Sequence, residues 1–221
     1  MTIKVAKGYK GMGMDGYIAR WYANLTEKNM ADFRKDAQMV ASNLREGAAV
    51  LEVAPGPGYL AIALAQLGKY DITGLDISAT FVEIAQAKAK EAGVTVNFQQ
   101  GNASQMPFAD TTFDFIVCRA AFKNFSEPVQ ALDEMHRVLK PGGKAVIIDM
   151  RGDASDDDMN REVNKMGLGT INRFITKWTF KHMLVKRAYT QVQFSKMVAQ
   201  SRFKTCTVRE DGIGLEVWLE T

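Results

Sequence analysis

The sequence has few cysteines and histidines and no long hydrophobic run, and each shortage excludes a class of protein. Its 221 residues include two cysteines, Cys118 and Cys206, and two histidines. The cysteines lack CxxC spacing, which argues against a disulfide framework and a Cys/His zinc site, so we expect no bound metal. No apolar run approaches the roughly 18 residues of a membrane span, and the first ten residues lack the apolar core of a signal peptide. We therefore expect a cytoplasmic protein.

The net charge of +3 is small, but the charges are unevenly placed. Residues 161–204 contain ten Lys and Arg and a single acid, Glu162, whereas four aspartates gather just upstream at positions 153–158. Such an excess forms a solvated face or attracts an anionic substrate, a lipid surface or RNA. The sequence leaves these alternatives open.

Short apolar runs alternate with amphipathic stretches through the middle of the chain. The runs predict strands at Ala49–Val53, Asp71–Leu75, Val94–Gln99, Phe113–Cys118 and Lys144–Asp149, and the stretches predict helices at Tyr59–Gly68, Ala79–Ala92 and Val129–Leu139. Strands that are apolar throughout and separated by helices indicate parallel βαβ units. A closing helix at Tyr189–Gln200 and a hairpin of Thr205–Glu210 with Leu215–Glu220 complete the pattern. We predict an α/β fold with helices on both faces of the sheet and an antiparallel last strand.

The stretch VLEVAPGPGYL, residues 50–60, is a candidate ligand loop because it ends a predicted strand and begins a helix. Gly56 and Gly58 permit close approach of backbone to a ligand, and the helix that follows offers free amides. A pyrophosphate would be repelled by Glu52, whereas an ammonium group would be attracted to it. Asp76, at the end of the next strand, is placed to bind ribose hydroxyls. An amino acid joined to a nucleoside satisfies both acids.

Five ordered motifs carry a resemblance to a known family: VLEVAPGPG, ITGLDIS, GNASQMPF, FDFIVCRA and HRVLKPGGKAVIID. They resemble the class I S-adenosylmethionine-dependent methyltransferases of the type 11 kind, strongly over residues 50–150. The resemblance implies a Rossmann-like sheet of seven strands and S-adenosylmethionine as cofactor. Ala54 stands where the family usually has its first glycine, which the turn tolerates if φ at Ala54 stays negative.

The resemblance also implies a set of cofactor-binding residues. Glu52 and the loop would hold the methionine part, Asp76 the ribose, and Ile77 and Asn102 the adenine. The full set is Tyr22, Glu52, Ala54, Gly56, Gly58, Asp76, Ile77, Asn102, Ala103, Ser104, Cys118 and Arg119.

The acceptor is less clearly indicated. Lys123-Asn124, with the stretches MPFADTTFD and ALDEMHRVLKPGG, is similar to ubiquinone/menaquinone C-methyltransferases, whereas the loop APGPG and the N-terminal segment differ from that subgroup. We expect a small hydrophobic or aromatic acceptor, enclosed by the N-terminal helix and a lid. The predicted substrate-binding residues are Tyr17, Trp21, Phe122, Lys123, Asn124 and Trp178.

Residues 151–188 are predicted to form that helical lid, because Ile171, Phe174, Ile175, Trp178 and Val185 share one helical stripe. His182 lies within the stripe and is the candidate catalytic base, although methyl transfer can proceed by positioning alone. The remaining segments of this single domain, residues 1–221, are an N-terminal helical cap (1–45), the cofactor-binding core (46–150), and the closing helix and strands (189–221).

Two other functions remain open. An NAD-dependent oxidoreductase could use the same glycine turn, since residues 56–61 fit G-x-G-x-x-A, and the basic region 161–204 could bind RNA. Because the aromatic stripe suggests burial, we expect no nucleic-acid partner and favour a lid over contact with a membrane surface. Whether the protein is a monomer or a homodimer is open.

Overall fold

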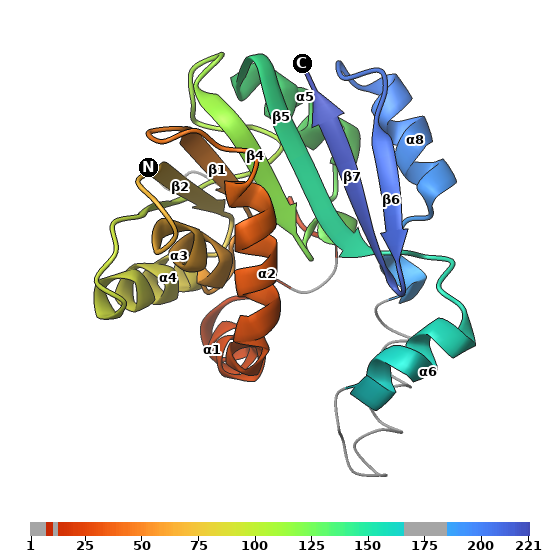
Figure 1. Cartoon of the computed structure of the whole chain (residues 1–221), viewed down its shortest axis with the longest axis horizontal. Helices are drawn as coiled ribbons and strands as arrows, with labels where there is room; N and C mark the ends of the chain where they lie inside the picture. The colour runs from red at the N-terminus through yellow and green to blue at the C-terminus, as the bar shows by residue number, and fades with distance from the viewer. Residues whose placement is uncertain (1–7, 11–12, 166–184) are drawn as a thin grey trace.

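The computed structural model describes residues 8–10, 13–165 and 185–221 and contains one seven-stranded sheet (Figure 1). The strands lie in the order β3-β2-β1-β4-β5-β7-β6. Their bounds are β1 (Ala49–Val53), β2 (Asp71–Asp76), β3 (Asn97–Gln100), β4 (Phe113–Arg119), β5 (Leu139–Met150), β6 (Thr207–Asp211) and β7 (Gly214–Glu220). The predicted fold class is confirmed.

The first five strands are parallel, and the last strand, β7, runs antiparallel to both of its neighbours, β5 and β6. It therefore lies one place inside the edge, which β6 forms. A tight turn through Gly212, with φ +55°, joins the two strands of this predicted hairpin. Strand order reverses between β1 and β4, so the carboxyl ends of these strands are where ligands bind in open α/β sheets.

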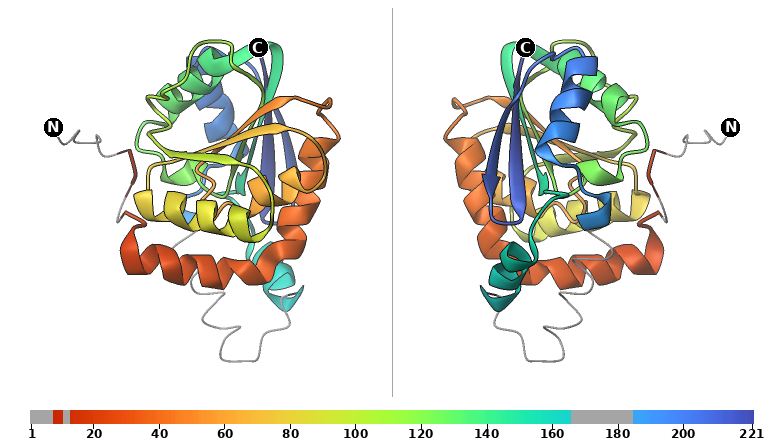
Figure 2. Two further views of the ribbon diagram at one scale, coloured as in Figure 1. Left: turned by 90° about the vertical axis from the view of Figure 1, so that its left-hand side faces the viewer. Right: turned by 90° about the vertical axis from the view of Figure 1, so that its right-hand side faces the viewer.

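Helices cover both faces of the sheet (Figures 1 and 2). One face packs against α2 (Met30–Ala41), α3 (Tyr59–Ala65) and α4 (Ala79–Glu91), with α1 (Gly16–Thr26) lying across α4. The other face packs against α5 (Pro128–Val138) and α8 (Gln191–Gln200). The two cores use alternate strand residues: Val50 faces the first and Leu51 the second, as the two-residue period of a strand requires.

Local sequence sets where several helices begin. The Ser78 side chain accepts a hydrogen bond from the Phe81 amide and caps α4, Pro128 starts α5, and Thr190 and Gln193 form a reciprocal capping box at α8. The N-terminal helical region is divided by the short helix η1 (Glu27–Asn29).

The predicted lid begins with α6 (Asp156–Lys165), whose first turn carries three aspartates that complement the helix dipole. The short helix η4 (Val185–Arg187) ends the region. Ile171, Phe174, Ile175, Trp178 and His182 lie outside the described residues, as does the part of the basic region between residues 166 and 184. Within the described part, no helix is long and apolar enough to cross a membrane.

Candidate functional site

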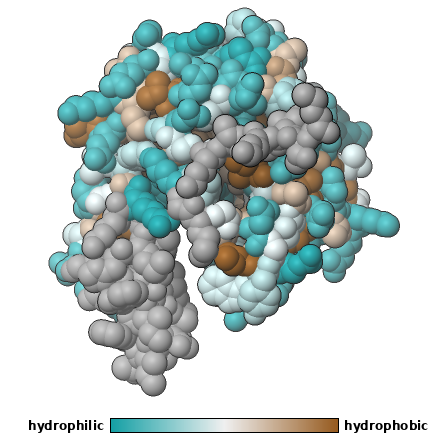
Figure 3. Space-filling model, turned by 180° about the vertical axis from the view of Figure 1, so that it is seen from behind, coloured by the Kyte–Doolittle hydropathy of each residue, from teal (hydrophilic) through white to brown (hydrophobic). Residues whose placement is uncertain are grey.

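A cavity of about 400 Å³ opens at the carboxyl ends of β1, β2 and β4. Figure 3 shows hydrophobic side chains gathered in a recess on the face of the molecule opposite to that of Figure 1. The cavity's size is within the range of small-molecule sites. Its lining includes nine of the twelve predicted cofactor-binding residues: Tyr22, Glu52, Ala54, Gly56, Asp76, Ile77, Asn102, Ala103 and Arg119.

Glu52 is buried at the end of β1, with 2% of its surface exposed, and lines the cavity. Its Oε2 accepts a hydrogen bond from the Ala61 amide, in the first turn of α3, at 2.9 Å. Burial raises the pKa of Glu52 to about 8, against the opposing effects of this hydrogen bond and of Arg119. A buried carboxylate with so little local compensation would gain from a cationic group in the cavity.

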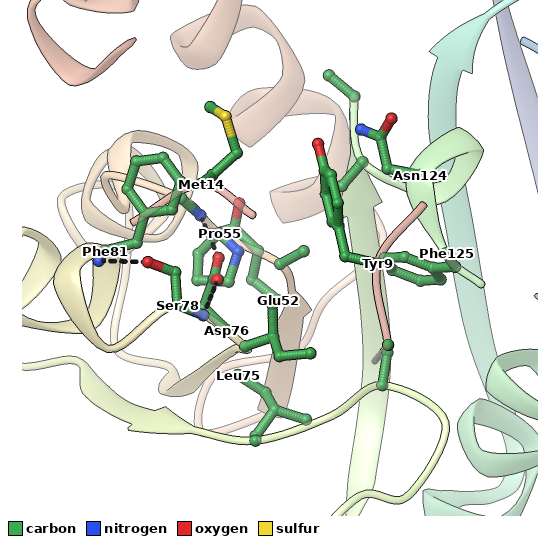
Figure 4. Close-up of a pocket in the computed structure, with 18 of the residues that line it drawn as sticks. Tyr9, Met14, Glu52, Pro55, Leu75, Asp76, Ser78, Phe81, Asn124 and Phe125 are labelled. Atoms are coloured by element: carbon green, nitrogen blue, oxygen red, sulfur yellow. Dashed lines mark hydrogen bonds between the residues drawn. The ribbon is translucent and has the colours of Figure 1, made fainter. Parts of the chain in front are cut away.

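Asp76 ends the neighbouring strand, β2, and is almost as buried as Glu52. Figure 4 shows its two oxygens accepting hydrogen bonds from the amides of Ser78 and Gly56, each at 2.9 Å. Burial raises the pKa of Asp76 to about 6, and these amides limit the rise. Because an ionised carboxylate has about four acceptor positions, Asp76 retains the capacity to bind hydroxyl groups of a ligand.

The loop between β1 and α3 differs from expectation at Ala54. Its φ is +57°, so the expected negative φ is wrong. In this left-handed conformation the Ala54 amide donates to the Leu75 carbonyl at 2.8 Å, which ties the loop to β2. Gly56 is also left-handed, with φ +54°, and its amide serves Asp76.

Gly58 does not line the cavity. A Cβ atom at this position would lie 2.8 Å from the Phe98 ring and 2.9 Å from Ala85. The glycine with φ +81° is thus required where α3 packs against α4 and β3. Its role in the structure is close packing behind the loop.

The predicted adenine end is formed by Ile77, Asn102 and Ala103. The Asn102 Oδ1 accepts a hydrogen bond from the Ser104 amide at 2.9 Å, and Ser104 itself is buried outside the lining. Gly8 packs so closely here that a Cβ on it would lie 2.8 Å from both Asn102 Oδ1 and Ile77. The N-terminal segment therefore covers this end of the cavity.

Arg119, at the end of β4, is the cation in the lining, and α2 holds it. Its Nε donates to Asp36 at 2.5 Å, and its guanidinium lies over the Phe33 ring at 4.2 Å. Cys118, the residue before, is fully buried and outside the lining, and burial raises its thiol pKa well above the usual range. With the acids Asp15, Glu52 and Asp76 also in the lining, the cavity favours a positively charged ligand.

The wall opposite Asp76 consists of Tyr9, Asn124 and Phe125, and we call these three residues the opposite wall (Figure 4). Tyr9 pairs with Phe125 in an antiparallel bridge, and the Lys10 amide donates to the Asn124 carbonyl at 2.7 Å. Burial raises the pKa of the Tyr9 phenol, so this hydroxyl is neutral and able to donate a hydrogen bond.

Lys123, next to this wall, is buried and not in the lining. Its Nζ donates to Asp149 Oδ1 and to the Ala120 carbonyl, each at 2.6 Å, and Asp149 also accepts from the Lys123 amide. Lys123 is therefore neither solvated nor in contact with the cavity. It braces η2 (Phe122–Asn124), the turn that presents Asn124.

Three other predicted substrate-binding residues, Phe122, Tyr17 and Trp21, do not line the cavity. Phe122 is fully buried among Phe125, Tyr189 and Phe194. Tyr17 and Trp21 lie on the outer face of α1, 83% and 55% exposed. Trp178 and the candidate base His182 are outside the described residues, so their roles stay predictions.

Sequence reasoning missed several lining residues, mainly Tyr9, Met14, Phe33, Ser78 and Phe81. Ser78 and Phe81 could have been found, because a Ser capping the helix after Asp76 must lie at the strand end. No local pattern marks Tyr9, which long-range pairing brings to the site. Among the described residues there is no group of His, Cys, Asp and Glu that could hold a metal ion.

Residues 51–147 match a family model described as a methyltransferase domain. A curated relative, the demethylmenaquinone methyltransferase of Bacillus velezensis, is 39% identical over 149 residues, which cover 63% of this chain and 64% of the relative. The chain thus spans less than two thirds of that relative's length.

Two solved structures share the fold. A candidate S-adenosyl-L-methionine-dependent methyltransferase from Methanococcus maripaludis has a TM-score of 0.75 and 20% identity, with 95% of this chain and 94% of that chain covered. A SAM-dependent methyltransferase from Aquifex aeolicus has a TM-score of 0.66 and 22% identity, covering 86% and 97%.

Proposed function

We propose that the chain is a methyltransferase, since residues 51–147 match a methyltransferase domain model, and that it transfers a methyl group from S-adenosylmethionine to a small hydrophobic or aromatic acceptor. The observation that carries this proposal is the pair of buried carboxylates, Glu52 and Asp76, at the ends of adjacent strands on one cavity. A pyrophosphate would be repelled by both, whereas an α-ammonium group and a ribose diol match them.

Different residues of the cavity would bind different parts of this cofactor. Glu52 would bind the ammonium group, Asp76 the ribose, and Ile77 with Asn102 and Ala103 the adenine. When bound, S-adenosylmethionine supplies an activated methyl group on its sulfonium. The chain's contribution is to hold the acceptor in line and exclude water, which Gly8, Tyr9 and Tyr22 would do from the N-terminal side.

The acceptor is proposed to lie against the opposite wall. Phe125 and Phe33 offer apolar surface, while the Tyr9 hydroxyl and the Asn124 amide offer hydrogen bonds to an oxygen on the acceptor. The names of the curated relatives support a demethylated quinol as the first acceptor to test. The described lining contains no His or Lys, and we keep His182 as the candidate base for an acceptor that must lose a proton.

Isothermal calorimetry with S-adenosylmethionine and with NAD tests the cofactor assignment. We expect binding of the first and none of the second, with Asp76→Ala weakening binding at least about tenfold because a buried charge-assisted hydrogen bond is lost. Leu67→Ser, an exposed change elsewhere, is the control. Undetectable binding of S-adenosylmethionine, or full affinity in Asp76→Ala, would contradict the assignment.

The acceptor is tested by incubating the protein with quinols, phenols, amines and thiols and measuring S-adenosylhomocysteine release. A hydrophobic phenol or quinol should give the fastest release. Tight, steeply salt-dependent binding of RNA would favour the alternative in which the basic region 161–204 holds a nucleic-acid acceptor. We propose that the chain forms a single domain in which residues 1–45 and 151–188 enclose the acceptor.

A further inference from the structure

The outer face of α1 is an exposed apolar stripe. Five large hydrophobic side chains are exposed among the described residues, and three of them, Tyr17, Trp21 and Leu25, are on this helix. They recur every four residues and therefore share one face. The helix buries the opposite face through Ala19 and Ala23. Figure 2 shows α1 in the lower part of the molecule, with α4 above it.

Charge on this face has one sign. Arg20 lies one turn from Tyr17 at the flank of the stripe, and Lys28 follows α1 in the short helix η1; both side chains are exposed. Within the part of the chain that the structure describes, neither takes part in an ion pair. Gly16–Thr26 contains no acidic residue, and the nearby Glu27 is engaged by Lys88 at 2.9 Å.

From this combination we propose that the outer face of α1, formed by Tyr17, Arg20, Trp21 and Leu25, docks on an anionic lipid surface together with Lys28 of η1. Tyr and Trp suit the boundary between water and acyl chains, Leu25 adds apolar area, and the two cations attract acidic headgroups. A second copy of the chain fits less well, because two such faces would bring like charges together.

The helix α1 lies between the proposed docking face and the cavity. Tyr22, on the inner side of the helix, lines the cavity, as do Met14 and Asp15 just before it. A surface bound to the outer side would thus lie one helix away from the cavity. If the acceptor is hydrophobic, which rests on the proposed function, it would reach the cavity from the lipid phase.

Co-sedimentation of the full chain with lipid vesicles tests the proposal. We expect binding to phosphatidylcholine vesicles in which about a third of the lipid is phosphatidylglycerol, weakening as salt rises, and little binding to phosphatidylcholine alone. The double variant Tyr17→Ser/Trp21→Ser should bind at least about tenfold more weakly. Arg20→Glu/Lys28→Glu should lose about fivefold or more for each charge. Leu67→Ser and Val192→Ser, which replace exposed hydrophobic side chains on other surfaces, should bind as the unaltered chain does.

Absence of binding by the unaltered chain at low salt would overturn the proposal. Full binding by the folded stripe variant would also overturn it and assign vesicle contact to another surface, such as the basic region 161–204. A stripe variant that turns a dimer into a monomer without affecting vesicle binding would assign the face to a second copy. If Tyr17→Ser/Trp21→Ser fails to fold, vesicle binding by Arg20→Glu/Lys28→Glu tests the proposal instead. Cofactor affinity of the same samples is measured separately, so failure here leaves the proposed function standing.

Discussion

The two sides of the cavity are assembled in different ways. On one side, Glu52, the loop 54–57 and residues 76–78 form a cradle from the ends of adjacent strands, and backbone amides hold both acids. On the opposite wall, Tyr9 and Phe125 come from segments more than a hundred residues apart, joined by a single bridge. The cradle is local and preorganised, whereas the opposite wall depends on long-range contacts. Changes on the two sides should therefore separate cofactor binding from acceptor use.

The largest effect is expected behind the opposite wall, at Lys123. Lys123→Met removes the partner of the buried Asp149 and should lower the free energy of unfolding by about 3–5 kcal/mol, measured by urea denaturation. Lys123→Met/Asp149→Leu should recover part of this loss, because no buried charge is left unpaired. A loss below about 1 kcal/mol in the single variant would show that the pair does not brace η2.

In the cradle, Glu52→Gln should weaken S-adenosylmethionine binding by about 2–3 kcal/mol, or 30- to 150-fold, because a buried charge partner is lost. Calorimetry measures this, and the variant should keep its fold because Gln is nearly the same size. Cys206→Ser, remote from the cavity, serves as the control. Unchanged affinity would remove Glu52 from the cofactor site.

The raised pKa of Glu52, about 8, makes cofactor binding pH-dependent. The carboxyl must lose its proton to attract an ammonium group, so affinity should rise with pH, by up to about tenfold per pH unit well below 8, and the rise due to Glu52 should level off above pH 8. Calorimetry between pH 6 and 8 measures the slope. Glu52→Gln should bind with little dependence on pH over this range, and an equal slope in the variant would place the titrating group elsewhere.

On the opposite wall, Tyr9→Phe should weaken acceptor binding by about 1 kcal/mol, because one hydrogen bond is lost. The KM for the acceptor should therefore rise roughly fivefold. The affinity for S-adenosylmethionine should stay the same, since the ring still covers the cavity. Steady-state kinetics with calorimetry on the same samples separates the two quantities. A fall in cofactor affinity with unchanged KM would show that Tyr9 contacts the cofactor and not the acceptor.

The smallest effect is expected at Ala54, where φ is +57°. Ala54→Gly relieves about 1 kcal/mol of left-handed strain and adds a similar unfolded-state entropy, so stability should rise by less than about 1 kcal/mol. Ala54→Val should be clearly destabilised in the same thermal scans, because a β-branched residue tolerates this conformation poorly. Equal melting temperatures for the Ala54→Gly and Ala54→Val variants would show that the backbone at residue 54 is not strained.

The fold was predictable because its signals are local. A mainly apolar run predicted the strand at Ala49–Val53 with the correct bounds. The helices that alternate with the strands predicted that neighbouring strands run parallel. The placement of Glu52 and Asp76 at one cavity followed from where their strands end. The conformation of Ala54 did not follow, because a left-handed φ at a residue other than glycine is uncommon and has no signal in the local sequence.

The exposure of side chains was less predictable than the fold. Lys123 was expected to bind the substrate, yet it is buried against Asp149, which lies 26 residues away in the chain. Tyr17 and Trp21 were expected to face the acceptor, and the helix turns them outward. A helical pattern shows which residues share a face, but only packing against α4 decides which face points inward.

The sequence by itself determined the order of strands and helices, the loop after β1 and the two acids beside it, because hydrophobic period, turn residues and strand ends are properties of neighbouring residues. Tertiary structure alone decided the opposite wall, the burial of the Lys123–Asp149 pair and the outward face of α1. Each of these depends on residues that are distant in the chain and meet only when the sheet and its two helical layers have formed.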